Sequence, residues 1–355
     1  MRLTFQTFAR VVGAALVISA QALGPAAADD FPRTATGRPD LSGTYDIATL
    51  TPLVRPVELA ERSAYSAEEA GELVGYWKEK FESDNVPSDP DRGAPPKGGI
   101  GFYIPELEGA AGAVGGYNAF FVDLGENTFQ LDGKYRTSIV TDPSDGRFPP
   151  LSPLGEEIQA RGAPFRHANT GTAWWLESGL ATGPYDDIEL RPLAERCILS
   201  RNRSGPPALP ALYNNLKTIV QTEDHVVVLA EQMHDARIIR MNGDRPPGNV
   251  AKWMGDSVGR WEGDSLVVET SQFRESSGDL RTTAGLRVVE RFSPIDSDTL
   301  RYQFTVDDPR YTAPWTGEYP WPRTDGRLYE YACHEGNYAM GNIKRGARML
   351  EADRE

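Results

Sequence analysis

The sequence predicts a mainly β protein whose C-terminal part is an antiparallel up-and-down barrel of about eight strands, of the lipocalin-like type. From Leu216 onward, short runs rich in Val, Ile, Thr, Tyr and Phe follow one another, with turn residues between them. No helical periodicity interrupts them. Antiparallel strands leave exposed edges unless the sheet closes, and eight strands close around a side-chain core or one small ligand. A two-sheet β-sandwich is the alternative.

The strand candidates are continuous β-favouring runs. They are LKTIVQT (216–222), HVVVLAEQ (225–232), ARIIRM (236–241), SVGRWEG (257–263), SLVVETSQF (265–273), LRVVERFSPI (286–295), TLRYQFTV (299–306) and LYEYAC (328–333). The fourth and fifth are expected to form a hairpin, because Gly263 tolerates the positive φ of a tight turn. In the fifth, Leu266 and Val268 alternate with Val267 and Glu269, so each pair occupies one face.

Residues 29–116 are expected to form an N-terminal extension with one helix and a long loop rich in Gly and Pro. Residues 41–46 could add a first strand. The helix should begin at Ser66, because Ser66 and Glu69 have capping-box spacing and the apolar residues that follow share one stripe. Residues 84–116 are too long for an ordinary connector, so we expect a flap or a wrapped surface loop.

The β-rich barrel domain is expected to cover residues 117–355. It should start with two or three strands up to Pro143 and a short helix capped by Ser152. A loop-rich stretch then leads to Asn215 and the barrel. A short helical tail is expected after Cys333.

Residues 1–28 resemble a cleavable export signal. Arg2 and Arg10 supply a basic start, residues 11–23 are apolar, and small residues precede an expected cut after Ala28. The apolar run is too short to span a bilayer, and no later run is long enough. The mature protein is therefore expected in the periplasm or outside the cell, with no membrane anchor.

The chain is acidic, with a formal net charge of −14. Removal of the signal takes away two arginines and no acidic residue, which leaves −16. Nucleic acid and anionic membranes bind through Lys and Arg that displace counterions, so neither is expected as a partner. The expected partner is a small-molecule substrate or ligand, and the sequence does not indicate an oligomeric state.

Cys197 and Cys333 are the two cysteines of the chain. In an exported protein a disulfide between them is expected. The alternative is a nucleophilic thiol at Cys333, where the adjacent His334 could lower the thiol pKa.

Histidines beside carboxylates, at the ends of predicted strands, are the candidates for catalysis. His234 and Glu231 lie between two strands, and His334 and Glu335 follow the last one. Such a histidine suits a general acid or base near neutral pH. The alternatives are a turn histidine satisfied by Asp235, and a helix N-terminus at His334 and Glu335.

Candidate substrate-binding residues are polar or aromatic and lie near the same strand ends. They are Arg237, Tyr213, Asn214, Asn215, Arg260 and Tyr338. The amides before the first barrel strand could stabilise an oxyanion. Arg260 could instead pair with Glu262 on the outer face, because strand alternation gives the two residues one side.

No motif for a phosphate loop, a dinucleotide site, a serine-hydrolase elbow or a zinc protease is present, and no metal-ligand cluster is evident, so no cofactor and no metal are expected. We therefore expect a lyase or hydrolase that acts by histidine–carboxylate acid–base catalysis. Its substrate would be small and either glycoside-like or hydrophobic and hydroxylated. The alternative is a periplasmic, lipocalin-like carrier of an apolar small molecule.

Several short motifs occur between residues 115 and 345. They are YNN before IVQT, HDARI, GDSVGRWEGDSLVVET, VVERF, FTVDDP and YEYACHEGNY. Their combination resembles a large family of exported bacterial proteins of uncharacterised function. This chain departs from the pattern at Leu216, where related sequences tend to carry a third asparagine. The resemblance implies one exported, β-rich domain and assigns no catalytic residue.

Overall fold

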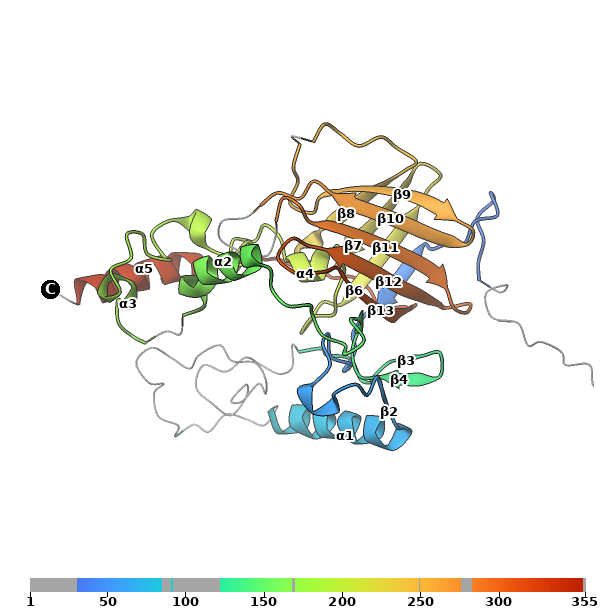
Figure 1. Cartoon of the computed structure of the whole chain (residues 1–355), viewed down its shortest axis with the longest axis horizontal. Helices are drawn as coiled ribbons and strands as arrows, with labels where there is room; N and C mark the ends of the chain where they lie inside the picture. The colour runs from blue at the N-terminus through green and yellow to red at the C-terminus, as the bar shows by residue number, and fades with distance from the viewer. Residues whose placement is uncertain are drawn as a thin grey trace, which may run out of the picture.

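The protein is mainly β, with one large curled sheet and one small sheet (Figure 1). The computed structural model describes residues 31–84, 91, 122–167, 170–248, 250–275 and 283–353. The expected export signal, most of the Gly/Pro-rich loop and the expected domain boundary at residue 116 lie outside these ranges.

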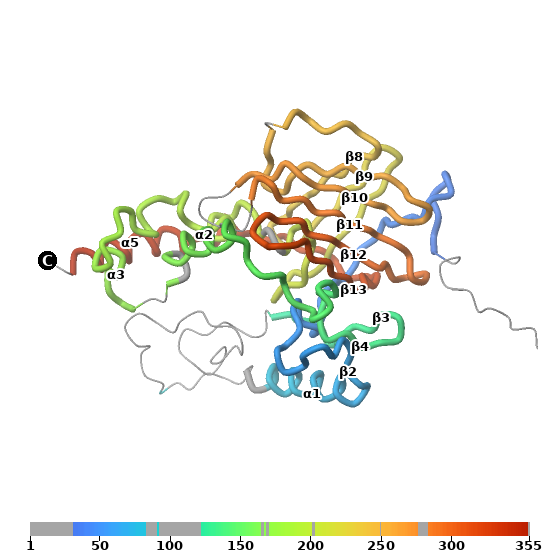
Figure 2. Tube along the Cα trace, in the orientation of Figure 1, coloured from blue at the N-terminus to red at the C-terminus, as the bar shows by residue number. Residues whose placement is uncertain are grey.

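Ten strands form the large sheet, in the order β1-β6-β7-β8-β9-β10-β11-β12-β13-β5. Their bounds are β1 Gly43–Asp46, β5 Val140–Asp142, β6 Leu216–Gln221, β7 His225–Ala230, β8 Ala236–Met241, β9 Asp256–Glu262, β10 Ser265–Ser271, β11 Arg287–Pro294, β12 Thr299–Asp307 and β13 Trp315–Pro322. All neighbours are antiparallel except β8 and β9, which run parallel. The tube in Figure 2 follows these strands around the curl of the sheet.

The edge strand β1 contacts the residues that follow β13. Arg323, the residue after β13, forms a β-bridge with Tyr45 of β1, and the Thr324 amide donates to Thr44 O over 2.9 Å. The sheet is therefore a half-barrel in which the edge strand β1 contacts the chain that leaves β13. The mainly β, largely antiparallel prediction is confirmed, but the sheet has ten strands rather than eight.

Seven of the eight predicted strands form, as β6 to β12. The eighth prediction is wrong, because residues 328–333 form no strand and β13 takes the expected place beside β12. The segment of β13 contains Pro320 and Pro322, which argue against a strand in a sequence. Proline is tolerated on an edge strand, and β5 pairs with β13 only at Thr316 and Gly317.

The helices and the small sheet surround the half-barrel. The helices are α1 Ala67–Asp84, α2 Pro153–Gly162, α3 Trp174–Glu177, α4 Arg201–Ser204 and α5 Tyr338–Ala352, and the small sheet contains β2 Ala64–Tyr65, β3 Gln130–Leu131 and β4 Lys134–Arg136. Figure 1 shows α2, α3 and α5 grouped on one side of the large sheet. None of the helices in the described ranges is both long and apolar enough to cross a membrane.

Two of the predicted helix starts are confirmed by their caps. Ser66 Oγ accepts from Glu69 N over 3.1 Å, while Glu69 Oε2 accepts from Ser66 N over 2.8 Å. Ser152 Oγ accepts from Gly155 N over 3.1 Å at the start of α2. Each cap satisfies amides that a helix start leaves without intrahelical partners.

The inner face of the half-barrel is filled by aromatic side chains. Tyr45, Tyr302, Tyr319 and Trp321 are each at most 1% exposed. The loop around Ala208 enters the same space, because Ala208 N donates to Tyr302 Oη over 2.9 Å and Ala208 O accepts from Tyr319 Oη over 2.7 Å. The interior is thus a packed core with a few buried hydroxyls that find partners.

The predicted disulfide is confirmed, and it leads to a stability prediction. Cys197 and Cys333 are bonded across a sequence separation of 136 residues, so reduction frees a long loop in the unfolded chain. We expect a reductant to lower the free energy of unfolding by roughly 4–5 kcal/mol, measured by urea titration. A Cys197→Ala/Cys333→Ala variant should not respond to the reductant. If the wild type has the same urea midpoint with and without the reductant, this expectation is contradicted.

Candidate functional site

The turn between β7 and β8, residues 231–235, carries several of the groups that could act chemically. Glu231 is 6% exposed, His234 is exposed and Asp235 is half-buried. Met233 and His234 have positive φ angles of 63° and 51°. This backbone region is unfavourable for residues other than glycine, so contacts around the turn must hold it.

Residues 329–331, which we call the strap, run along this turn and bond to its side chains. Glu231 Oε1 accepts from Tyr329 N over 3.2 Å, and His234 Nε2 accepts from Tyr331 N over 2.6 Å. The alternate amides of the strap are those that a strand would offer to backbone carbonyls. Here side chains accept them, which explains why a strand-like sequence forms no strand.

The bond from the strap determines which nitrogen of His234 carries a proton. A backbone amide can only donate, so Nε2 is unprotonated and the proton of the neutral ring is on Nδ1. His234 therefore anchors the strap through one nitrogen. The ring can take up a proton only at Nε2, and only when the bond to Tyr331 N opens.

Lys217 of β6 lies beside the same turn. It is opposite Ala230 in the β6–β7 register, and Ala230 N donates to Asp235 O over 2.9 Å. Lys217 is 1% exposed. Burial lowers the pKa of its ammonium to about 8, against the attraction of Glu231 and Asp235.

Asp235 is the carboxyl of the turn that titrates closest to neutrality. Burial raises its pKa to about 6, while the Ser204 hydroxyl and the Lys217 ammonium favour the ionised form. Among the described residues, Oδ2 of Asp235 has no hydrogen-bond partner. That oxygen is itself buried, so the carboxylate, with a pKa near the working pH, could act as a general base only if a substrate gained access to it.

A pocket of about 460 Å³ adjoins the strap. Its walls come from residues 194–197, from Asn214, from the strap residues Glu330 and Tyr331, and from the first turns of α5. The prediction placed Asn214 near a substrate, and the structure puts it on this wall. The pocket and the turn are thus adjacent, with Tyr331 belonging to both.

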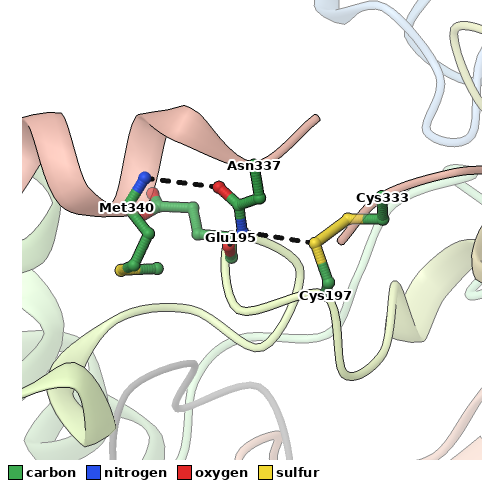
Figure 3. The surroundings of a disulfide bond; sticks show 5 residues. All are labelled: Glu195, Cys197, Cys333, Asn337 and Met340. Atoms are coloured by element: carbon green, nitrogen blue, oxygen red, sulfur yellow. Dashed lines mark hydrogen bonds between the residues drawn. A yellow bond between two sulfur atoms is a disulfide. The ribbon is translucent and has the colours of Figure 1, made fainter. Parts of the chain in front are cut away.

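The disulfide and the start of α5 form the floor of this region (Figure 3). Asn337 caps α5 by accepting from Met340 N over 3.3 Å. Its amide also donates to Glu195 O over 2.8 Å and to Cys197 Sγ over 3.3 Å. These bonds fix the helix start against the disulfide, so this part of the pocket is preorganised.

His334 and Glu335 are exposed in the turn that leads into α5, where Asn337 N donates to His334 O over 3.3 Å. This position matches the helix-terminus alternative. Tyr338, the first residue of α5, is 78% exposed. All three are close in sequence to the strap, but the strap bonds to Glu231 and His234 instead.

Two predicted substrate-binding residues are engaged in the fold. Asn215 is 1% exposed; its Oδ1 accepts from Ala211 N over 2.7 Å, and its Nδ2 donates to Asp123 O and Ala211 O over 2.8 and 3.0 Å. Arg260 donates to Glu262 Oε1 over 3.0 and 2.7 Å on the exposed face of the sheet. For Arg260 the structure shows the outer-face alternative, and for Asn215 it leaves no amide hydrogen for a substrate.

Arg237 and Tyr213 have different surroundings. Arg237 points to the inner face, where it forms a bidentate pair with Glu290, with Nη2 3.0 Å from Oε1. Tyr302 Oη also donates to Glu290, over 2.7 Å. The guanidinium of Arg203 lies 5.5 Å from the ring of Tyr213, and Tyr213 in turn contacts Tyr331 of the strap. Tyr213 is therefore part of the site, whereas Arg237 is part of the core.

The sequence analysis did not identify Lys217 or the role of Asp235. The available signal for Lys217 was its alternation with Ile219 on one face of a strand. That signal did not show which face of the strand is buried, because Thr218 and Val220 on the opposite face also favour a strand. The pKa of Asp235 depends on burial by parts of the chain that are distant in sequence.

Within the described ranges, no three side chains of His, Cys, Asp or Glu gather as metal ligands would. Comparison of the whole chain with known proteins finds no matching family model, no matching curated protein and no matching solved structure. The function is therefore inferred from the geometry of the site.

The buried pair of Arg237 and Glu290 gives a prediction that separates a core role from substrate binding. Glu290→Gln leaves the Arg237 cation without a counter-charge at 3% exposure, so we expect a loss of roughly 3–5 kcal/mol in the free energy of unfolding. Chemical denaturation measures it. The double variant Arg237→Met/Glu290→Leu should recover most of the loss. A cost below about 1 kcal/mol for Glu290→Gln would show that the pair is not a core element.

Proposed function

We propose that the protein is an exported enzyme, a lyase or hydrolase, that uses acid–base catalysis on a small hydroxylated substrate held in the pocket beside the strap. The observation that supports this most directly is the carboxyl of Asp235, which has a pKa of about 6 and one oxygen without a partner among the described residues. Perturbed carboxyls beside a pocket are typical of sites that move protons.

The charges around the turn suit proton abstraction near pH 7. Asp235, with a pKa of about 6, is then mostly ionised, and Lys217, with a pKa of about 8, is mostly protonated. A base and a cation are thus present together at one pH. In this proposal Asp235 takes a proton from the substrate, and the charge of Lys217 keeps the carboxylate ionised from within the fold.

His234 is assigned the exchange of protons with solvent. It follows Glu231 in the same turn and is the neighbour of Asp235 in sequence. The ring is exposed, and its Nε2 can take up a proton from solvent when the bond to Tyr331 N opens. Glu231 is assigned to the strap, because its carboxylate accepts from Tyr329 N.

The carrier alternative requires an open space for an apolar ligand inside the barrel. The inner face instead packs Tyr302, Tyr319 and Trp321 against one another, with ring centroids 4.7 Å apart for Tyr302 and Trp321. The loop at Ala208 bonds to two of these residues. This packed interior favours a function at the strap over a function in the barrel.

Export to the periplasm or the medium is part of the same proposal. The bond between Cys197 and Cys333 fits an oxidising compartment. The basic and apolar start of the sequence, with small residues before Asp29, supports the same location.

The proposed base is tested by Asp235→Asn, with Asp224→Asn as the matched control at the other end of β7. A substrate is first sought among chromogenic glycosides and aryl substrates that undergo elimination. We expect Asp235→Asn to lower kcat/KM by about 10²-fold or more, since the base is lost, and Asp224→Asn to leave it unchanged. If Asp235→Asn and His234→Ala both remain within about threefold of the wild type, the assignment is wrong.

The pH profile gives an independent test of the electrostatics. The logarithm of kcat/KM should fall as the pH drops through about 6, because Asp235 takes up a proton. The ammonium of Lys217 lowers the pKa of Asp235, so Lys217→Met should raise that pKa and move the acidic limb to higher pH. If the acidic limb of the kcat/KM profile lies at the same pH in Lys217→Met as in the wild type, the titrating base is not Asp235.

A further inference from the structure

We propose that the strap is a pH-released gate between the pocket and the turn of residues 231–235, closed while Nε2 of His234 accepts from Tyr331 N and opened when a proton occupies that nitrogen. The hydrogen bonds of the strap and its position beside the pocket support this gate. It therefore holds or fails independently of which residue is the catalytic base.

The strap has two side-chain anchors, and the histidine is the one that loses its ability to accept when it binds a proton. Tyr331 N is 2.6 Å from His234 Nε2, and Tyr329 N is 3.2 Å from Glu231 Oε1. When Nε2 binds a proton it becomes a donor and faces the N–H of Tyr331, so the bond is replaced by a repulsive contact.

The strap lies between the two parts of the site. Glu330 and Tyr331 form part of the wall of the pocket, while the amides of Tyr329 and Tyr331 face the turn. The Tyr331 side chain also contacts Tyr213 and Gln232. A displacement of the strap would therefore join the pocket to the turn and uncover residues that are now buried.

Fixed points on both sides limit how far the strap can move. Before it, Thr324 N donates to Thr44 O of β1 over 2.9 Å. After it, Cys333 is bonded to Cys197. Release of the two anchors would free residues 325–332 without detaching α5, which is the geometry of a tethered flap.

Several charged groups lie near the two anchors. A test must distinguish the effect of protons on these groups from the effect of protons on the anchors. Lys217 from β6 and Asp46 from the end of β1 act on Glu231, and Arg203 from α4 faces Lys217. Asp235 faces His234, and Tyr213 and Tyr331 are neighbours in the same cluster. Of these, Asp235 has a pKa of about 6 and would titrate in the same range as a histidine.

The test is amide hydrogen exchange measured by mass spectrometry on the full chain, expressed as protection relative to intrinsic exchange. Between about pH 8 and pH 5, where histidine changes charge, we expect the protection of residues 329–331 to fall at least roughly tenfold while that of β10 is unchanged. His234→Gln should keep its protection at low pH, because a glutamine oxygen accepts without titrating. His225→Gln, at an exposed histidine at the start of β7, should behave as the wild type.

Three results would overturn the proposal. One is unchanged protection of the strap in the wild type across this pH range, which needs no variant to fold. Another is a His234→Gln variant that loses protection as the wild type does. The third is a pH response that disappears in Asp235→Asn and persists in His234→Gln, which would assign the titration to Asp235.

Discussion

The contact between Arg323 and β1 is the constraint on which the site depends. The guanidinium donates to Ser42 O and Asp40 O over 2.5 and 2.8 Å, and it lies 5.1 Å from the ring of Phe31. A Cβ at Gly43 would come within 2.2 Å of Arg323 Nη1, so only glycine admits the arginine there. The end of β13 is thereby placed beside β1 instead of remaining at the far edge of the sheet. Because β6 and β7 follow β1 in the sheet, the chain that leaves β13 reaches the turn of residues 231–235.

A second constraint is the burial of charge on the inner face. Arg237 and Glu290 are 3% and 0% exposed, and Lys217 is 1% exposed. Arg237 and Glu290 compensate each other, and Tyr302 donates to the same carboxylate. Among the described residues Lys217 has no such ion pair, and the negative charges of Glu231 and Asp235 favour its ammonium form. The core charges are therefore balanced locally, whereas the charges beside the strap are balanced only as a group. This difference is why we propose the strap end of the sheet, rather than the core, as the part that responds to a proton.

Features of this structure that depend on neighbouring residues could be predicted from the sequence, whereas features that depend on distant segments could not. The hairpin of β9 and β10, the caps at Ser66 and Ser152, and the disulfide all depend on short-range patterns or on a single possible pairing, and all are confirmed. β13 could not be recognised because its prolines are tolerated only at the end of the strand that β5 does not pair with. The strap has the composition of a strand, but its amides bond to side chains that a sequence pattern cannot locate. The parallel contact of β8 with β9 likewise depends on the path of the connecting chain.

The same reasoning applies to the candidate site. Glu231 and His234 could be selected because a histidine near a carboxylate between strands is a local pattern, and the structure does bring both to the strap. Asn215 and Arg260 have the same kinds of groups, but their hydrogen bonds are completed within the fold. Lys217 and Asp235 become unusual only through burial, which depends on chain segments more than ten residues away. Sequence patterns thus identify the titratable groups, while the tertiary structure decides which of them titrate near neutrality.

The position of His234 next to Asp235 links access to the site with its chemistry. Protons favour the open strap through His234, and they also neutralise Asp235, whose pKa is about 6. The state in which the base is ionised is therefore the state in which the strap is closed. A substrate that fills the pocket meets the strap residue Tyr331 before it meets the turn. Under the two proposals, reaction at neutral pH requires brief openings against two hydrogen bonds of ordinary strength, a modest barrier that protein motions cross readily.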